Sequence, residues 1–149
     1  GTGGRELGLL VRYAEAGAFV DAAREAARRA GVRFLWYSPV PLCHYNPIAR
    51  GLGNKSCAAC DGLVSVAPDG SVLPCSSWPE AVGSALDGKF RGTWFSDRAS
   101  RIKDKREAPE ACRACASFTA CQGACPLYWT AVGTAEIDGR ARRAAGRAS

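Results

Sequence analysis

The sequence predicts an α+β protein in which a helix–strand unit precedes a small, loop-rich region containing a β-hairpin and short helices. Three observations predict this class. A helical apolar pattern runs directly into a β-rich stretch, two further β-rich runs flank a Pro-Asp-Gly turn, and eight cysteines gather in the remaining loops. The 149 residues are 47% apolar and 23% charged, which is typical of a globular domain, and no apolar run is long enough to span a membrane.

The segment before residue 43 forms the predicted helix–strand unit. Residues 14–30 predict a helix, and Gly31 is well placed to end it. Residues 32–37 are rich in β-branched and aromatic types and predict a strand. One such unit cannot bury both faces of its strand, so we expect it to complete a larger sheet rather than only to cover the small sheet that follows. The apolar residues near one face of the helix are Phe19, Val20, Ala23, Ala27 and Ala30.

The hairpin is predicted from residues 63–66 and 71–73, which are joined by Pro68-Asp69-Gly70. This is favourable turn chemistry because Pro fixes φ and Gly accepts a positive φ. The hairpin brings Cys75 back towards the cysteines that precede it. A short helix is expected after Ser96, whose side chain is suited to cap it. We expect four nearby aromatic residues to cover metal sites and form a small core: Trp78, Phe90, Trp94 and Phe95.

The cysteine content limits the chemistry. Eight cysteines allow a disulfide framework, but that solution is typical of shorter secreted chains that lack a core. Thiolate-only metal sites are the alternative, with zinc or iron–sulfur clusters commonly taking four cysteines each. A single histidine, His44, nearly excludes mixed Cys/His zinc sites, and we interpret it as a hydrogen-bonded loop residue. The candidate metal ligands are Cys43, Cys57, Cys60, Cys75, Cys112, Cys115, Cys121 and Cys125.

The last four cysteines follow the pattern Cys-x2-Cys-x5-Cys-x3-Cys-Pro. Zinc knuckles are usually separated by a dozen or more residues, so these four thiols are poorly spaced for one tetrahedral ion. The compact run is closer to the ferredoxin arrangement, in which three cysteines hold one cluster and the fourth crosses to another. By that analogy, Cys125 serves a different cluster from Cys112, Cys115 and Cys121.

With Gly70-x4-Cys75 placed before this run, the pattern resembles the SPASM domain, which forms the C-terminal part of many radical S-adenosylmethionine (SAM) enzymes. The resemblance implies three regions: residues 1–42 as the last helix–strand unit of a radical SAM partial barrel, 43–128 as the SPASM domain, and 129–149 as a C-terminal segment with a basic tail. It also implies two auxiliary [4Fe-4S] clusters. The first would use Cys57, Cys60, Cys75 and Cys125, and the second Cys112, Cys115 and Cys121.

Two departures from the family pattern matter. No cysteine follows Cys125, where the family carries another, so Cys43 is our candidate for the fourth ligand of the second cluster, with an open iron site as the alternative. The CxxxCxxC motif that binds the SAM-cleaving cluster in this family is also absent. The chain is therefore not expected to be catalytic by itself. Its radical SAM domain, with SAM and a third [4Fe-4S] cluster, would be supplied in cis or in trans.

The resemblance implies a peptide or protein maturase whose auxiliary clusters transfer electrons and help to engage the substrate, with ferredoxin or flavodoxin as reductant. Two alternatives are a self-standing ferredoxin-like electron carrier and a zinc-stapled structural or nucleic-acid-binding module. The formal net charge of +6 and the arginines of the tail favour the latter slightly. Two clusters of about −2 each would offset most of that charge, which makes nucleic acid an unlikely partner. Reduced thiols predict a cytoplasmic protein.

Overall fold

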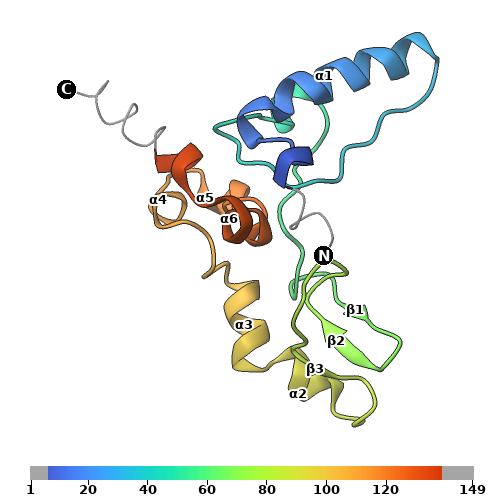
Figure 1. Cartoon of the computed structure of the whole chain (residues 1–149), viewed down its shortest axis with the longest axis vertical. Coiled ribbons are helices and arrows are strands. Elements are labelled where there is room, and N and C mark those ends of the chain that lie inside the picture. Colours follow the sequence, from blue (N-terminus) through green and yellow to red (C-terminus); the bar gives the residue numbers. More distant parts are fainter. Residues whose placement is uncertain (1–6, 139–149) are drawn as a thin grey trace. The chain divides into compact units, whose positions relative to one another are not determined.

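The computed structural model describes residues 7–138, so the predicted basic tail at Arg140, Arg142, Arg143 and Arg147 lies outside the described residues. The chain divides into two compact units, which are treated separately below. The hairpin unit is Ala58–Glu107, and the cavity unit is residues 7–57 and 108–138. Figure 1 labels the α-helices and strands. In chain order, the elements are η2 Leu7–Leu9, α1 Tyr13–Arg29, η3 Ile48–Arg50, β1 Ser65–Val66, β2 Ser71–Leu73, β3 Gly83–Ser84, α2 Phe90–Trp94, α3 Asp97–Lys103, α4 Glu110–Arg113, α5 Phe118–Cys121 and α6 Pro126–Val132.

The predicted N-terminal helix is confirmed as α1. Gly31 adopts φ +66°, the left-handed conformation that glycine takes without steric cost. The Gly31 N–H donates to the Arg28 carbonyl (3.2 Å), and the Val32 N–H donates to the Ala27 carbonyl (3.0 Å). These two bonds satisfy carbonyls that would otherwise lack partners at the helix end, so the helix stops where the sequence predicted.

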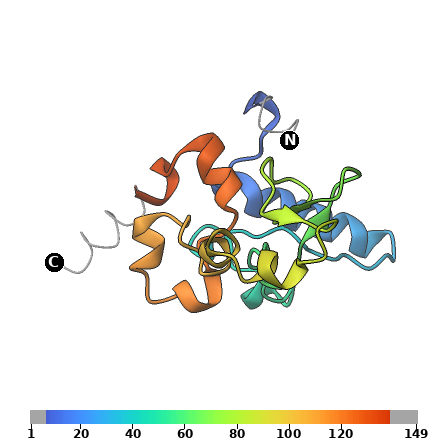
Figure 2. The ribbon, with the colours of Figure 1, turned by 90° about the horizontal axis from the view of Figure 1, so that it is seen from below.

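The buried face of α1 differs from the predicted one. Tyr13 and Val20 are buried, whereas Phe19 is 60% exposed. A β-carbon on Gly17 would come within 2.8 Å of the Tyr45 ring, so the helix packs closely along a Tyr13–Gly17–Val20 stripe. Figure 2 shows the first turns of α1 (blue) beside α6 (red), where Tyr13 stacks on Tyr128. The expected face is confirmed for Val20 and wrong for Phe19, because aromatic packing at the start of the helix sets its rotation.

The predicted strand at residues 32–37 does not form. This segment has no regular secondary structure. Its side chains still alternate as in a strand, with Phe34 and Trp36 packed against the core and Leu35 and Tyr37 exposed. A strand requires a neighbour to accept and donate its backbone hydrogen bonds, and in the described residues the only multi-stranded sheet lies in the hairpin unit.

The hairpin is confirmed as the centre of a three-stranded antiparallel sheet of order β1–β2–β3. Ser65 pairs with Leu73 and Val66 with Val72. At the turn, Gly70 has φ +84°, and the Asp69 carboxylate accepts a hydrogen bond from the Ser71 N–H at 2.9 Å. Val72 on the central strand is fully buried, so the small core of this unit lies under β2.

Two short helices follow the sheet in the hairpin unit. A side chain at Gly83 of β3 would collide with Thr93, so α2 packs closely on this edge of the sheet. The predicted helix after Ser96 is confirmed as α3, and the Ser96 hydroxyl accepts a hydrogen bond from the Ala99 N–H at 3.2 Å. The expected aromatic core is wrong for Phe90 and Phe95, which are 45% and 62% exposed.

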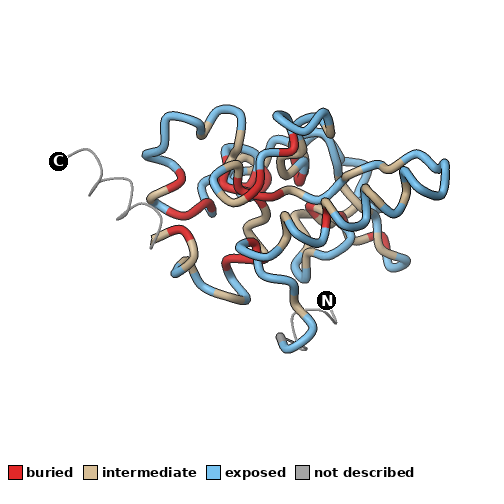
Figure 3. Tube along the Cα trace, turned by 90° about the horizontal axis from the view of Figure 1, so that it is seen from above, coloured by how far each residue is buried: buried red, intermediate tan, exposed pale blue. Residues whose placement is uncertain are grey.

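The cavity unit has its own core, built from α1, α6 and the loops between them. Its buried positions (among those in red in Figure 3) include Tyr13, Val20, Tyr128 and Trp129. The Tyr13 and Tyr128 ring centroids lie 3.8 Å apart, and Trp129 meets Tyr128 edge-on at 5.0 Å. Within residues 7–138, no helix combines the length and apolar character needed to cross a membrane.

Candidate metal centre

Four of the eight predicted ligands line one cavity of about 340 Å³ in the cavity unit. Cys112 is buried, Cys121 is half-buried, and Cys43 and Cys115 are exposed. Apolar residues that include Pro41, Phe118 and Ile137 form much of the remaining wall. Cys43 and Cys121, which are 78 residues apart in the chain, thus line the same cavity.

Short helices position the three cysteines of the compact run. Cys112 belongs to α4, and its carbonyl accepts from the Cys115 N–H at 3.0 Å, which keeps the two residues on one tight turn. Cys121 is the last residue of α5, and Gln122 directly after it is left-handed with φ 54°. Gly123 and Ala124 also have positive φ. The chain therefore turns sharply after Cys121 and separates it from Cys125.

Cys43 reaches the cavity through a tight loop that follows Pro41. The Pro41 carbonyl accepts hydrogen bonds from the His44 N–H (2.9 Å) and the Tyr45 N–H (3.1 Å). In the same loop the Leu42 N–H donates to the Cys121 sulfur at 3.4 Å. This contact ties the two sides of the cavity together. It also supplies a backbone donor to a candidate metal-binding sulfur, which stabilises negative charge on that sulfur.

The cavity favours the neutral form of its buried thiol. Burial raises the pKa of Cys112 to about 12, and repulsion by the thiolates of Cys121 and Cys43 adds to the rise. Proximity alone disfavours the ionised form of these thiols, because neighbouring thiolates repel one another. A bound cation reverses this effect because it neutralises the thiolates and displaces their protons.

The donor set fits an iron–sulfur cluster better than a single ion. Within the described residues, no three His, Cys, Asp or Glu side chains are grouped to hold one metal ion. A tetrahedral zinc ion requires every sulfur to lie about 2.3 Å from the same atom. In a cluster each cysteine binds its own iron, so the sulfurs surround a larger body. The cavity is lined by four cysteines, which is the number of ligands that such a cluster takes.

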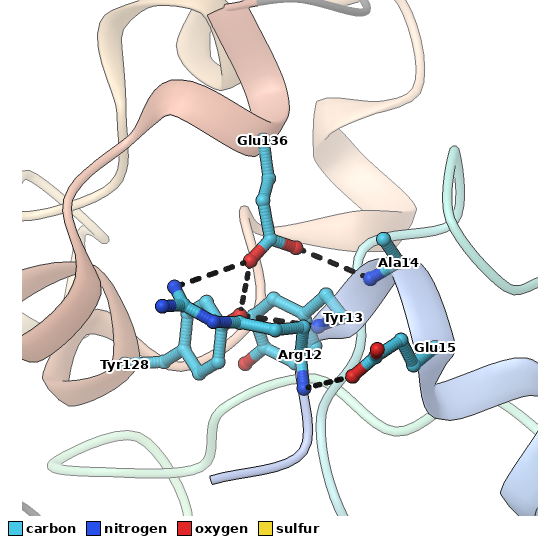
Figure 4. A network of polar contacts seen from close by, with 6 residues as sticks. All are labelled: Arg12, Tyr13, Ala14, Glu15, Tyr128 and Glu136. Atoms are coloured by element: carbon cyan, nitrogen blue, oxygen red, sulfur yellow. Dashed lines mark hydrogen bonds and ion pairs between the residues drawn. The ribbon is translucent and has the colours of Figure 1, made fainter. Parts of the chain in front are cut away.

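Cys125 and Cys57 also belong to the cavity unit, but neither lines this cavity. Cys125 is the N-cap of α6, and its N–H donates to the Tyr13 hydroxyl at 3.3 Å. Figure 4 shows the network behind this contact. The Tyr13 N–H donates to the Tyr128 hydroxyl (3.1 Å), which itself donates to Glu136 (2.6 Å). The polar groups of α1 and α6 thus fix the backbone at Cys125.

Cys60 and Cys75 belong to the hairpin unit. Cys60 is 1% exposed, adopts φ +54°, and donates its N–H to the Leu63 carbonyl at 2.9 Å. The observed β1–β2 pairing ends at Ser65–Leu73, two residues before Cys75. The return of Cys75 alongside Cys57 and Cys60, like the role of these cysteines as ligands, stays a prediction.

Sequence reasoning missed a buried lysine next to this loop. The Lys105 side chain is only 8% exposed, and its Nζ lies 3.4 Å from an Asp61 carboxylate oxygen. Asp61 directly follows Cys60 in the chain. A buried lysine requires a partner, and the pair ties the residues after α3 to the Cys60 loop. No sequence pattern indicated Lys105, because it stands among six other Lys and Arg residues between 89 and 106.

Residues 57–116 match the SPASM family of iron-sulfur cluster-binding domains. The resemblance drawn from the sequence is confirmed for this segment, which contains five of the eight cysteines. The SPASM segment ends before Cys121 and Cys125, and it begins after Cys43. No curated protein and no solved structure matches the chain. The chain therefore contains a segment that is similar to an iron–sulfur cluster-binding domain, and three of its candidate ligands lie outside the matched segment.

Proposed function

We propose that this chain binds two auxiliary [4Fe-4S] clusters and is the C-terminal part of a radical SAM enzyme. The observation that carries the proposal is the cavity lined by Cys43, Cys112, Cys115 and Cys121. Four thiols on one apolar cavity are a complete ligand set for one cluster. Cys43 takes the place of the family cysteine that this sequence lacks after Cys125.

The residues of the cavity have separate tasks. The four thiols bind iron, and the Leu42 N–H donates to the Cys121 sulfur. Such donors stabilise the more reduced state of a cluster and raise its reduction potential. Phe118 and Ile137 exclude water from part of the wall. A cluster bound here would supply one-electron transfer, which is the chemistry that its thiolate ligands cannot supply themselves.

The remaining cysteines are the proposed ligands of the other cluster: Cys57, Cys60, Cys75 and Cys125. This assignment is supported by the family pattern, with Gly70-x4-Cys75 and the CxxxC spacing of Cys121 and Cys125. With all eight cysteines used, the two clusters would bring the net charge from +6 to about +2.

The radical SAM context is supported by residues 32–37. Val32, Leu35 and Tyr37 are 60%, 51% and 72% exposed on a β-rich segment that has no strand partner within the described residues. We propose that this segment adds to the sheet of a radical SAM domain supplied in cis or in trans. That domain would bring SAM, its own [4Fe-4S] cluster and the reaction on a peptide or protein substrate, with ferredoxin or flavodoxin as reductant in the cytoplasm.

Anaerobic reconstitution with iron and sulfide tests the proposal. We expect about eight irons and eight sulfides per chain, as two four-iron clusters require, with broad absorption near 400 nm. Cys43→Ser should lose one cluster or convert it to a three-iron form, visible by electron paramagnetic resonance. Cys115→Ser, which removes a ligand of the compact run, is the positive control.

Three results would count against the proposal. Stoichiometric zinc without sulfide, after expression under anaerobic and iron-replete conditions, would support the zinc-stapled module. Full cluster content in Cys43→Ser, with an unchanged spectrum, would remove Cys43 from the ligand set. A gene that encodes only this length, with no radical SAM partner, would favour the ferredoxin-like carrier.

A further inference from the structure

The hairpin unit carries an exposed group of apolar and cationic side chains around α2. Every residue from Ala85 to Gly92 is exposed. Within and just after this run, three large apolar side chains face solvent: Leu86 is 78% exposed, Phe95 is 62% exposed and Phe90 is 45% exposed. Lys89 and Arg91 lie between them in the chain. The Leu86 side chain lies over the Gly70 turn, so we call only the four residues Lys89, Phe90, Arg91 and Phe95 the α2 surface.

The anchoring of α2 explains why these side chains point outwards. Thr93 is buried, and it packs so closely on Gly83 of β3 that a side chain there would collide with it. Arg91 and Phe95 each lie two residues from Thr93, which places them on the opposite side of the helix. The Arg91 guanidinium carbon sits 5.5 Å from the centre of the Phe95 ring. The helix therefore presents a cation stacked on an aromatic ring to solvent.

The charges of the α2 surface are not neutralised within the hairpin unit. Four other cations of this unit each have a carboxylate partner: Arg98 with Glu80, Arg101 with Glu107, Lys105 with Asp61, and Arg106 with Asp104. Within the described residues, neither Lys89 nor Arg91 forms such an ion pair. The nearby carboxylate of Asp87 accepts the backbone N–H of Lys89 at 2.9 Å. The surface thus combines exposed rings with cations available to an external carboxylate.

We propose that the α2 surface binds an acidic peptide segment that carries aliphatic or aromatic side chains. Carboxylates of the segment would pair with Lys89 and Arg91, and its apolar side chains would cover Phe90 and Phe95. A peptide matches this surface because a peptide can place carboxylates and apolar side chains within a few residues of one another, as the cations and rings of the surface require. The α2 surface would thus be a docking surface for the peptide or protein substrate. The class of partner rests on the proposed function.

Fluorescence anisotropy on the reconstituted full chain tests the inference. The probe is a fluorescein-labelled peptide of Glu, Leu and Phe. The comparison probes are a peptide of Glu and Ser, a peptide of Lys, Leu and Phe, and a single-stranded RNA. We expect the first probe to bind most tightly, and its affinity to fall with added salt because part of the binding energy is electrostatic.

Two substitutions localise the site. Arg91→Ala and Phe95→Ala should each weaken binding by about threefold or more, as expected when a partly desolvated cation or aromatic contact is removed. Both residues are exposed, so circular dichroism should remain unchanged. Arg98→Ala is the matched control: it removes another exposed arginine, one that already pairs with Glu80, and binding should stay the same.

Several outcomes would overturn the inference. Equal affinity for the Glu/Ser peptide or for RNA would show that the surface binds anions without regard to apolar content. Self-association that Phe95→Ala abolishes would assign the surface to a second copy of the chain. Absence of binding in a sample with full iron and sulfide content would refute the docking surface and leave the proposed cluster function intact. Low iron content would refute the cluster function instead.

Discussion

At the scale of single residues, the cavity depends on positions where the backbone must turn left-handed. Gly123 has φ +72°, lines the cavity, and accepts a hydrogen bond from the Trp129 indole N–H at 2.6 Å. A β-carbon there would lie 2.8 Å from the β-carbon of Ala108 and 3.4 Å from that of Cys112. Gly123 therefore serves two needs, a backbone conformation and a close approach to the residue that carries the buried thiol.

Replacing Gly123 with Ala should destabilise the chain by about 1–3 kcal/mol, because the new methyl group adds a steric clash to an unfavourable φ. Urea denaturation of the reconstituted protein measures the change. Gly92→Ala is the matched control, since Gly92 lies in α2 with no atom within 4 Å of the added carbon. An equal effect of the two substitutions would show that packing around Gly123 is not limiting.

At the scale of elements, caps and close contacts decide where short helices form. The helix α3 has only seven residues, which is too short to be stable without tertiary or capping interactions. Ser96 caps its first turn through the Ala99 N–H, and Asp97 places a negative charge near the positive end of the helix dipole. These local signals were visible in the sequence, and the helix begins where they predicted.

Ser96→Ala should lower the stability of α3 by about 1 kcal/mol, because the Ala99 N–H loses its acceptor. Amide hydrogen exchange should show the loss as about fivefold less protection across Asp97–Lys103. Ser117→Ala provides the comparison, since Ser117 precedes α5 but its side chain makes no capping hydrogen bond. Unchanged exchange in α3 would indicate that packing of Ala99 and Ile102 alone holds the helix.

A second prediction at this scale concerns the contact between α1 and α6. Burial raises the pKa of Tyr13 and, together with the hydrogen bond to Glu136, that of Tyr128. The unfolded chain loses phenolic protons near pH 10, whereas the folded chain retains them. The two buried tyrosines therefore contribute their full stabilisation below about pH 10. As the pH rises further, the free energy of unfolding falls by up to about 1.4 kcal/mol per pH unit for each tyrosine.

The coupling between tyrosine deprotonation and unfolding is measured above about pH 10, as the slope of the unfolding free energy against pH. Tyr13→Phe should make the slope shallower, although it also removes the acceptor of the Cys125 N–H. Tyr37→Phe, which removes the hydroxyl of a tyrosine that is 72% exposed, is the matched control. Equal slopes for the parent and Tyr13→Phe would contradict the role of burial at this contact.

At the scale of the whole molecule, cysteines recur in both compact units, and metal binding is expected to contribute to folding. The buried core of each unit is small, and the structure describes all eight cysteines as thiols with no disulfide between them. Small domains with modest cores commonly depend on bound metal for stability. The segments that are proposed to bind clusters should therefore lose order when the metal is removed.

Treatment of the reconstituted chain with an iron chelator under anaerobic conditions should lower the melting temperature and reduce amide protection around the cysteines. The reason is that the free energy of metal binding adds directly to the free energy of folding. Circular dichroism and hydrogen exchange provide the measurements, with untreated protein as the reference. Identical melts with and without iron would show that the fold does not depend on the clusters.

The sequence predicted local structure well wherever the cause was local. The end of α1 at Gly31, the hairpin turn at Gly70 and the cap at Ser96 each follow from a few neighbouring residues. Predictions failed where a distant partner decides the outcome. Residues 32–37 have strand-forming side chains but no neighbouring strand, and Phe19 faces solvent because Tyr13 and Gly17 set the rotation of α1.

The cysteine spacing by itself predicted the resemblance to the SPASM family, which the match over residues 57–116 supports, because the number of residues between ligands reflects which of them can reach one cluster. Only the tertiary structure decided that Cys43 opens onto the cavity of Cys112, Cys115 and Cys121. It also decided that Lys105 is buried against Asp61 and that Phe95 is exposed. These outcomes depend on which surfaces pack together in space, and such long-range packing leaves no periodic or local signal in the chain.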